Sequence, residues 1–290
     1  EFCKKAGADV EIVKILVHNM EKKREGVDPS LLTDHWRDII DNDEIQLVIE
    51  VMGGIEPART MILDALNAGK NVVSANKDLI AEHGKELLDA AEEHGVDFLF
   101  EAAVAGGIPI IRPLKQCLVA NEIDEVIGIM NGTTNYILTK MFEDNMDFDE
   151  ALAKATELGY ADADPTADVE GLDAACKIVI IANSLMGWDV TLDDVSREGI
   201  SGISSNAVKL ALKDGYLIKL VAEANDGKLR VAPMLVKQGS PFAVNGTLNV
   251  ITLKTDLSED VTVVGVGAGS IETASAILSD IISIGKNNNN

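Results

Sequence analysis

The sequence predicts an α/β protein, in which a parallel sheet wrapped by helices precedes a second, α+β domain. In the first third of the chain, short apolar runs at residues 47–52, 71–75 and 98–100 alternate with longer segments of helical character. Apolar strands that alternate with helices of this length are typical of a parallel sheet covered by helices. Later, two β-rich runs between Tyr216 and Val236 flank an Asn-Asp-Gly turn, which predicts an antiparallel hairpin.

The remaining elements of the first third follow from local signals. The mixed apolar run at residues 10–17 predicts an initial strand. Pro57 stands in the first turn of the next helix, where proline is favoured, and Gly69 follows its end. A second helix is predicted at residues 79–94, because Gly95 then supplies its C-terminal cap.

A cluster of glycines and prolines at residues 106–113 marks a change of domain. We predict a discontinuous dinucleotide-binding domain at residues 1–107 and 247–290, and a catalytic and dimerisation domain at 108–246. Beyond the cluster, the patterns predict strands at 125–130, 248–253 and 261–264, and helices at 114–118, 192–198, 205–213 and 270–284, with a capped helix after Asp147 and an apolar one after Lys177.

The composition excludes several classes of protein. The 290 residues carry a formal net charge of -23, which disfavours binding to nucleic acid or to an anionic membrane surface. No apolar run reaches the roughly 18 residues of a membrane span. The three cysteines are far apart and form no CxxC motif, so neither a disulfide framework nor a zinc site is indicated. A reducing, cytoplasmic compartment is therefore predicted.

The most informative segment places several aspartates just ahead of a lysine on an apolar helix. Asp173 precedes Lys177 by four residues, so the two side chains lie one turn apart on the same face. The turns that follow are apolar nearly all round, which predicts a buried helix. A buried lysine is costly unless a carboxylate or a cleft receives it. A functional site is thus slightly favoured over an ordinary surface ion pair.

Two predicted strands end in residues suited to ligand binding. Gly53 and Gly54 follow the strand at 47–52, and Asn76 and Lys77 follow the strand at 71–75. In open α/β sheets ligands bind at the carboxyl ends of the strands. Lys77 therefore points either into a cleft or into solvent, and position alone slightly favours a solvated lysine at a helix start.

Two further turns are less specific. Glu101 lies among small residues, and one carboxylate with several exposed carbonyl oxygens suits a hard cation; a simple turn between domains is the alternative. The glycine-rich turn at residues 265–269 follows a strand and precedes a helix. Its backbone amides could bind an anion at the helix start, or it could be only a tight turn. The four histidines form no pair at metal-binding spacing.

Taken together, these segments resemble the homoserine dehydrogenase family. The resemblance covers nearly the whole chain and is most specific in the acidic segment at residues 158–177. It rests on that segment and on shorter matches: Asn131-Gly132-Thr133-Thr134-Asn135, Ala75-Asn76-Lys77, Gly106-Gly107-Ile108-Pro109, and Gly267-Ala268-Gly269 with Thr273-Ala274.

The resemblance implies the NAD(P)-linked interconversion of L-homoserine and L-aspartate 4-semialdehyde in threonine, methionine and isoleucine biosynthesis. By similarity, Lys177 and Lys77 are the candidates for proton transfer, and which of them acts stays open. Asp168 and Asp173 would orient the substrate and the lysines. Asp162 stands where the family usually carries a glutamate that binds the substrate's amino group, so its shorter side chain is a departure.

The resemblance also implies ligands and a partner. NAD or NADP would be lined by Gly53, Ser74, Asn76, Lys77, Gly159 and Gly269. A sodium ion would be held by Glu101 and by the carbonyl oxygens of Val104, Gly106 and Ile108. The second domain would pair with another copy into a homodimer. The choice between NAD and NADP is open, because the basic residues 22–24 suit a 2′-phosphate or a solvated loop equally.

One departure from the family bears on activity. No GxGxxG motif occurs before Val10, although the family begins with a strand and that fingerprint. We therefore expect an N-terminally truncated chain with poor cofactor affinity and an unpaired interior edge in its sheet. The absence also supports an alternative, a cofactor-free binding or scaffold protein derived from the fold. Another amino-acid dehydrogenase is a third alternative, against which the segment 171–177 speaks.

Overall fold

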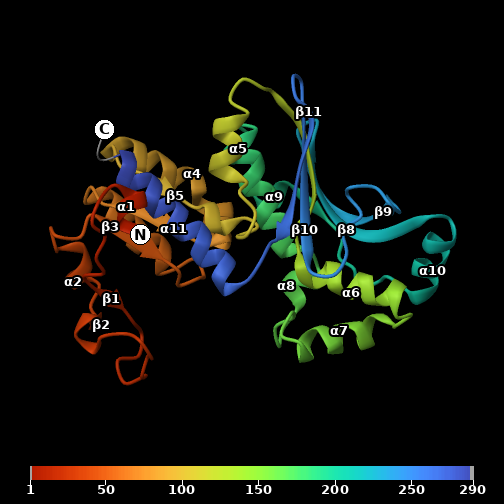
Figure 1. Cartoon of the computed structure of the whole chain (residues 1–290), viewed down its shortest axis with the longest axis horizontal. Helices are drawn as coiled ribbons and strands as arrows, with labels where there is room; N and C mark the ends of the chain where they lie inside the picture. The colour runs from red at the N-terminus through yellow and green to blue at the C-terminus, as the bar shows by residue number, and fades with distance from the viewer. Residues whose placement is uncertain (1, 288–290) are drawn as a thin grey trace. The chain divides into compact units, whose positions relative to one another are not determined.

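The computed structural model describes residues 2–287 of the chain (Figure 1). Within these residues there are two compact units, one made of residues 2–100 and 277–287 and the other of residues 101–276. Each unit has its own sheet and helices, as the predicted α/β and α+β division requires. Within the described residues, no helix has both the length and the apolar character that crossing a bilayer would demand.

The first unit is built on a parallel sheet of three strands in the order β3-β4-β5. The register pairs Leu47 with Asn71 and Val72 with Phe98. Val73 of β4 packs against Ile281 and Ile284 of the last helix. The elements are α1 (Phe2–Ala6), β1 (Ile15–Leu16), η1 (Pro29–Leu31), β2 (Leu32–Thr33), α2 (Arg37–Ile40), β3 (Leu47–Glu50), α3 (Ala58–Asn67), β4 (Asn71–Ser74), α4 (Lys77–His94) and β5 (Phe98–Leu99).

The predicted end of α4 at Gly95 is confirmed, whereas the helix begins two residues earlier than predicted, at Lys77. The side chain of Asn76 accepts a hydrogen bond from the amide of Leu79, which satisfies one donor of the first turn. Gly95 ends the helix with φ 65°, in the left-handed region that glycine adopts without strain. The prediction at residues 10–17 was wrong in extent. Only Ile15–Leu16 is a strand there, and it pairs with β2 instead of joining the β3-β4-β5 sheet.

The second unit is built on a six-stranded sheet in the order β11-β10-β6-β8-β9-β7. All its neighbours are antiparallel except β7 and β9. Helix α9 packs on β6, β8 and β9, and helix α6 packs on β8 and β10. The elements are η2 (Glu101–Ala103), α5 (Ile111–Cys117), β6 (Ile123–Ile129), α6 (Gly132–Glu143), α7 (Phe148–Glu157), α8 (Thr166–Val169), α9 (Leu172–Leu185), η3 (Leu192–Asp194), β7 (Val195–Arg197), α10 (Ser205–Lys213), β8 (Tyr216–Asn225), β9 (Lys228–Lys237), β10 (Leu248–Thr255) and β11 (Glu259–Val266).

The helix predicted at residues 192–198 is instead a short 3₁₀ turn followed by strand β7. The Thr191 and Asp194 side chains close a capping box around that turn. Val195 and the two residues after it then pair with β9 at the margin of the sheet. Pairing with the edge of β9 therefore overrides the local helical preference of residues 192–198.

The compact units differ from the predicted domain limits. Residues 247–266 belong to the second unit, because β10 and β11 complete its sheet beside β6. Helix α11 (Ser270–Asn287) continues from there, and only its part from Ile277 onward belongs to the first unit. The limit between the two units therefore falls inside α11, whereas the sequence placed it before β10.

Candidate active site

Lys177 is buried on α9 and held by two acceptors. Its side chain is 9% exposed, and its Nζ donates to the Asp173 Oδ2 at 2.7 Å and to the backbone carbonyl oxygen of Met130 at 2.7 Å. An ammonium has three N–H donors. In residues 2–287 the third donor of Lys177 meets no acceptor, so the site leaves one proton-bearing position unused.

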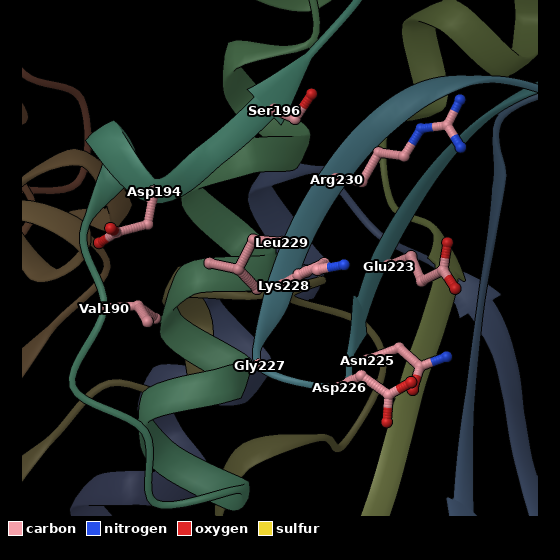
Figure 2. A pocket seen from close by; sticks show the side chains of 10 residues that line it. All are labelled: Val190, Asp194, Ser196, Glu223, Asn225, Asp226, Gly227, Lys228, Leu229 and Arg230. Carbon is pink, nitrogen blue, oxygen red and sulfur yellow. The ribbon is translucent and has the colours of Figure 1, made fainter.

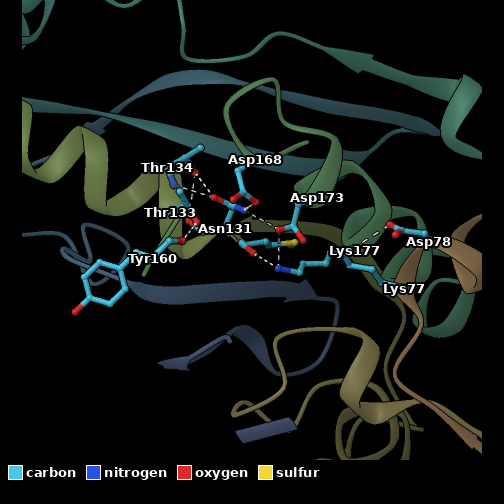
Figure 3. Close-up of polar contacts among 10 residues, drawn as sticks. Lys77, Asp78, Asn131, Thr133, Thr134, Tyr160, Asp168, Asp173 and Lys177 are labelled. Carbon is cyan, nitrogen blue, oxygen red and sulfur yellow. Dashed lines mark hydrogen bonds and ion pairs between the residues drawn. The ribbon is translucent and has the colours of Figure 1, made fainter. Parts of the chain in front are cut away.

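Asn131 joins the two predicted aspartates beside this lysine (Figure 3). Its Nδ2 donates to the Asp168 Oδ1 at 2.7 Å and to the Asp173 Oδ2 at 2.8 Å. Its Oδ1 accepts from the amide of Thr134 at 2.8 Å, which caps α6. Because a backbone amide can only donate, the Asn131 amide group has one orientation, and its NH₂ must face the carboxylates.

The electrostatics of the cluster are acidic. Asp168 and Asp173 contribute two carboxyl groups, whereas Lys177 contributes one cation. Burial raises the pKa of Asp168 above its usual range, and the neighbouring Asp173 carboxylate raises it further. Hydrogen bonds from Asn131 and Thr133 and the charge of Lys177 act in the opposite direction. Such a cluster suits a ligand that brings its own positive charge.

Local chain geometry explains why these side chains converge. Strand β6 ends at Ile129, so Met130 and Asn131 lie at its carboxyl end and open α6. Gly171, with φ 77°, turns the chain from α8 into α9 and places Asp173 in the first turn of that helix. The turn from β6 into α6 and the first turn of α9 therefore bring their polar side chains together.

Two predicted residues of the acidic segment lie apart from this cluster. Asp162 is exposed, and among the described residues it has no hydrogen bond or ion pair. Gly159, with φ 75°, follows the end of α7 and has open space around its Cα. The loop that carries both is fastened by Thr133, whose Oγ1 donates to the Tyr160 carbonyl oxygen at 2.7 Å.

In the first unit, Glu50 links the carboxyl ends of β3 and β4 by hydrogen bonds, a role that was not predicted. Glu50 is buried and accepts hydrogen bonds from the Ser74 Oγ at 2.7 Å and from the amides of Met52 at 2.7 Å and Gly53 at 3.3 Å. Asn76 donates to the Gly54 carbonyl oxygen at 2.7 Å. An acid inside an otherwise apolar strand was the signal that could have identified Glu50.

Lys77 is the first residue of α4 and belongs to this edge. Its Nζ lies 3.9 Å from the Asp78 Oδ1, and its side chain is 34% exposed. Lys77 is therefore far more exposed than Lys177 and is paired with an exposed acid. Within its unit it stands beside Asn76, the capping residue that carries the Gly54 contact.

The Glu101 carboxylate is bound to the start of α5. It accepts three backbone amides at the start of α5, from Ile110 at 2.6 Å, Ile111 at 2.9 Å and Arg112 at 2.8 Å. A carboxylate in this position anchors the helix start. Among residues 2–287, no group of three or more His, Cys, Asp or Glu side chains is arranged to hold a metal ion.

The glycines of the turn before α11 are required by close packing. A Cβ at Gly267 would collide with the side chain of Asn249, which is buried on β10. A Cβ at Gly269 would collide with the Glu272 carboxylate, and its φ of 142° suits glycine. The turn therefore brings bare backbone to the first turn of a long helix.

A separate hollow of about 470 Å³ lies at the β8–β9 hairpin (Figure 2). Glu223 and Arg230 face each other across the two strands there, and Asp226 stands in the turn. None of the predicted site residues lines it. Its mixed charges give it no preference for one kind of ligand.

The comparisons with known proteins match both units. The family model described as "Homoserine dehydrogenase, NAD binding domain" matches residues 3–101, and the one described as "Homoserine dehydrogenase" matches residues 109–282. The chain belongs to the homoserine dehydrogenase family. Its function is therefore NAD(P)-dependent oxidoreduction in the biosynthesis of the aspartate family of amino acids, and the scaffold and other-dehydrogenase alternatives are not supported.

Curated relatives agree. A homoserine dehydrogenase of Methanocaldococcus jannaschii is 52% identical over 85% of this chain and 75% of its own length. Those of Synechocystis and Corynebacterium glutamicum are 46% and 45% identical over 95% and 99% of this chain. This chain spans 66% and 67% of their lengths.

Solved structures show the same fold. A homoserine dehydrogenase from Thiobacillus denitrificans superposes with a TM-score of 0.94 at 40% identity, covering 98% of this chain and 67% of that one. A hyperthermophilic archaeal homoserine dehydrogenase in complex with NADPH gives 0.78 at 29% identity, covering 87% and 75%. The recognition of the family and fold class is confirmed. The comparisons do not support the predicted truncation.

Proposed function

We propose that Lys177 transfers the proton at the reacting oxygen of L-homoserine and L-aspartate 4-semialdehyde. The observation that carries this proposal is its unused third donor beside a fixed pair of acceptors. In alcohol oxidation a neutral Lys177 amine takes the hydroxyl proton, and in aldehyde reduction its ammonium returns a proton to the carbonyl oxygen. Bound NAD(P) supplies the other half of the reaction, accepting or donating the hydride at the adjacent carbon.

Asp168 and Asp173 give the substrate its orientation. Asp173 holds Lys177 at 2.7 Å, so it keeps the ammonium in place between turnovers. The cluster then carries one more carboxyl group than cations, which suits the α-ammonium group of homoserine near Asp168. Asp162 lies on the fastened loop and would contribute as a second acid to that ammonium group. Such positioning of reactants accounts for a large part of enzymatic rate enhancement.

The carboxyl edge of the first unit fits the dinucleotide. Gly53 and Gly54 have φ of 75° and 72° with open space where a Cβ would stand, so their backbone is free to approach a phosphate or ribose. Ser74, Asn76 and Lys77 line the same edge. Two glycines of the second unit complete the proposed cofactor set: Gly159 has open space where a Cβ would stand, whereas a Cβ at Gly269 would collide with the Glu272 carboxylate. NADP is proposed as one of the two cofactors, since a structural neighbour is a complex with NADPH.

A monovalent cation such as sodium is proposed at the turn after Glu101, held by main-chain oxygens. The carbonyl oxygens of Val104, Gly106 and Ile108 accept no hydrogen bond within residues 2–287. Carbonyl oxygens are suitable ligands for a hard cation. Glu101, whose carboxylate also anchors α5, would be the charged ligand of this proposed set.

The homodimer and the cytoplasmic location also remain proposals. Leu235 on β9 is 62% exposed and Val264 on β11 is 50% exposed, so apolar side chains stand on the six-stranded sheet. A second copy would remove such surface from water. The three cysteines are all free thiols, which agrees with a reducing compartment.

The test compares two alcohols that differ in the ammonium group. NAD(P)H formation is followed with L-homoserine and with 4-hydroxybutanoate, which lacks the amine. L-Homoserine should be preferred by about a hundredfold or more in kcat/KM, because only it pairs with the acidic cluster. Asp168→Asn should reduce that preference. Equal rates with both alcohols would contradict the proposed substrate orientation, and no NAD(P)H with either would contradict the proposed function.

A further inference from the structure

Lys219 on β8 is a fully buried lysine that the proposed chemistry does not use. Its side chain is 0% exposed. Its Nζ donates to the Asn135 Oδ1 at 2.7 Å, to the Asn245 Oδ1 at 3.0 Å and to the Thr139 Oγ1 at 3.3 Å. All three ammonium donors are therefore used, and every acceptor is a neutral oxygen.

The surroundings make this charge costly to keep. In the described part of the chain no carboxylate lies within ion-pair distance of Lys219, and the ring centroid of Phe142 lies 5.3 Å from its Nζ. Burial lowers the pKa of Lys219 to about 7, although the Glu143 carboxylate acts in the opposite direction. An apolar side chain of similar volume would fill the space at less cost, so packing alone does not account for a lysine here.

The contacts of Lys219 lead to the catalytic cluster through Asn135. The Asn135 Nδ2 donates to the carbonyl oxygens of Leu248 at 2.9 Å and Val244 at 3.2 Å, so its Oδ1 must face an ammonium donor. Its backbone amide donates to the Asn131 carbonyl oxygen at 3.2 Å. Asn135 therefore lies one turn from the residue that bridges Asp168 and Asp173.

The same network fixes the chain that enters β10. Thr139 donates to the Asn135 carbonyl oxygen at 2.7 Å and accepts from the amide of Gly246 at 3.1 Å. Strand β10 begins at Leu248 and pairs with β6, with Val250 opposite Ile129. Met130, which receives Lys177, is the next residue after Ile129. Lys219 thus binds both the helix and the loop that flank the carbonyl acceptor of Lys177.

We propose that Lys219 is a positioning residue for Lys177, acting through Asn135 on the start of α6 and through residues 244–248 on the end of β6. The inference rests on the proposed role of Lys177. A displacement of Met130 alters one acceptor of Lys177, and a displacement of Asn131 alters the other through its hydrogen bond to Asp173. Small displacements of reacting groups cost large factors in rate, up to about a hundredfold for 1 Å.

The test uses Lys219→Met, with Lys70→Met as the matched control. Lys70 is also buried, and its Nζ donates to two neutral carbonyl oxygens, of Asn42 and Ile45, both at 2.7 Å, in the first unit. We expect Lys219→Met to lower kcat for L-homoserine oxidation by about tenfold or more while KM for NADP stays within about twofold. Its pH profile of kcat should also move, because the surroundings of Lys177 change. Lys70→Met should leave kcat and the profile unchanged.

A second variant keeps the inference decidable if Lys219→Met does not fold. Asn135→Ser shortens the link and should cause a similar loss of kcat, and combining it with Lys219→Met should add little further loss. A folded Lys219→Met or Asn135→Ser protein with unchanged kcat and pH profile would overturn the inference. If Lys177→Met itself retained activity, the proposed catalytic role would fail, and this outcome is separate from the first.

Discussion

Two buried lysines of the second unit are held by opposite means. Lys177 donates to one carboxylate and one carbonyl oxygen and has a third donor left, whereas Lys219 uses all three donors on neutral side-chain oxygens. Asn131, which caps α6, binds the Asp173 that holds Lys177, and Asn135, one turn later on α6, binds Lys219. A lysine with an unused donor beside a fixed counter-charge is therefore suited to proton transfer. A lysine whose three donors are all bound by neutral oxygens is suited to positioning other residues.

The largest expected effect comes from removing the counter-charge of Lys177. Asp173→Ala leaves a buried ammonium without its carboxylate, which should destabilise the protein by about 3 kcal/mol. It should also lower kcat/KM for L-homoserine by about a hundredfold or more, since the proton-transfer group is no longer held. Urea unfolding and steady-state kinetics measure the two effects.

The chain offers a matched control for that experiment. Lys140 and Asp144 form an ion pair of the same four-residue spacing at 3.1 Å, but the Asp144 side chain is 38% exposed. Asp144→Ala should change stability by no more than about 0.5 kcal/mol and leave kcat/KM unaltered. Equal losses in the two variants would mean that the Asp173–Lys177 pair has no special place in catalysis.

A smaller effect is expected from the asparagine that joins the carboxylates. Asn131→Ala removes the α6 cap and should destabilise the protein by about 1 kcal/mol. The Asp168 and Asp173 carboxylates then lose a shared donor, so kcat/KM should fall by about tenfold or more. Asp147→Ala is the comparison, because it also removes a side chain that caps a helix, α7, but one outside the acidic cluster. Wild-type kcat in Asn131→Ala would contradict a bridging role.

The Lys219 cluster makes a prediction about stability and pH. Because the pKa of Lys219 is lowered to about 7 in the folded protein, the unfolded chain binds more protons above that pH. The free energy of unfolding should therefore rise between about pH 7 and pH 10, by at most about 1.4 kcal/mol per pH unit. Lys219→Met should remove this rise, as chemical denaturation at several pH values would show. If the free energy of unfolding rose with pH equally in both proteins, a group other than Lys219 would cause the pH dependence.

The smallest expected effect lies at the carboxyl edge of the first unit. Glu50→Gln keeps an oxygen for the Met52 amide but weakens the set of hydrogen bonds around Ser74 and Gly53. KM for NADP should rise by roughly threefold, with KM for L-homoserine unchanged, because only the cofactor edge is altered. A rise in KM for L-homoserine alone would show that this edge does not serve the cofactor.

Much of the fold was predictable because local signals and tertiary structure agree. Asn76 and Gly95 delimit α4 as capping rules require, and the Asn-Asp-Gly turn joins β8 to β9. The pairing of Asp173 with Lys177 also followed from helical spacing and an apolar helix. These features depend on neighbours within a few residues, which a sequence displays directly.

The rest depended on long-range contacts. Strand β7 forms because β9 offers an edge, and β10 and β11 complete a sheet that begins more than a hundred residues earlier. The role of Glu101 as an anchor for α5 needs a turn to bring its carboxylate to three amides. Lys219 stood in an ordinary β-rich run, and nothing local distinguished it from a solvated lysine.

The most direct test of the account is a single-turnover measurement on Lys177→Ala. The rate of NADPH formation from enzyme-bound NADP and L-homoserine is compared with that of the wild type, alongside NADP affinity by equilibrium binding. We expect the chemical step to slow by about a thousandfold while the Kd for NADP stays within about twofold. A reacting step within about tenfold of the wild type would contradict the assignment of proton transfer to Lys177.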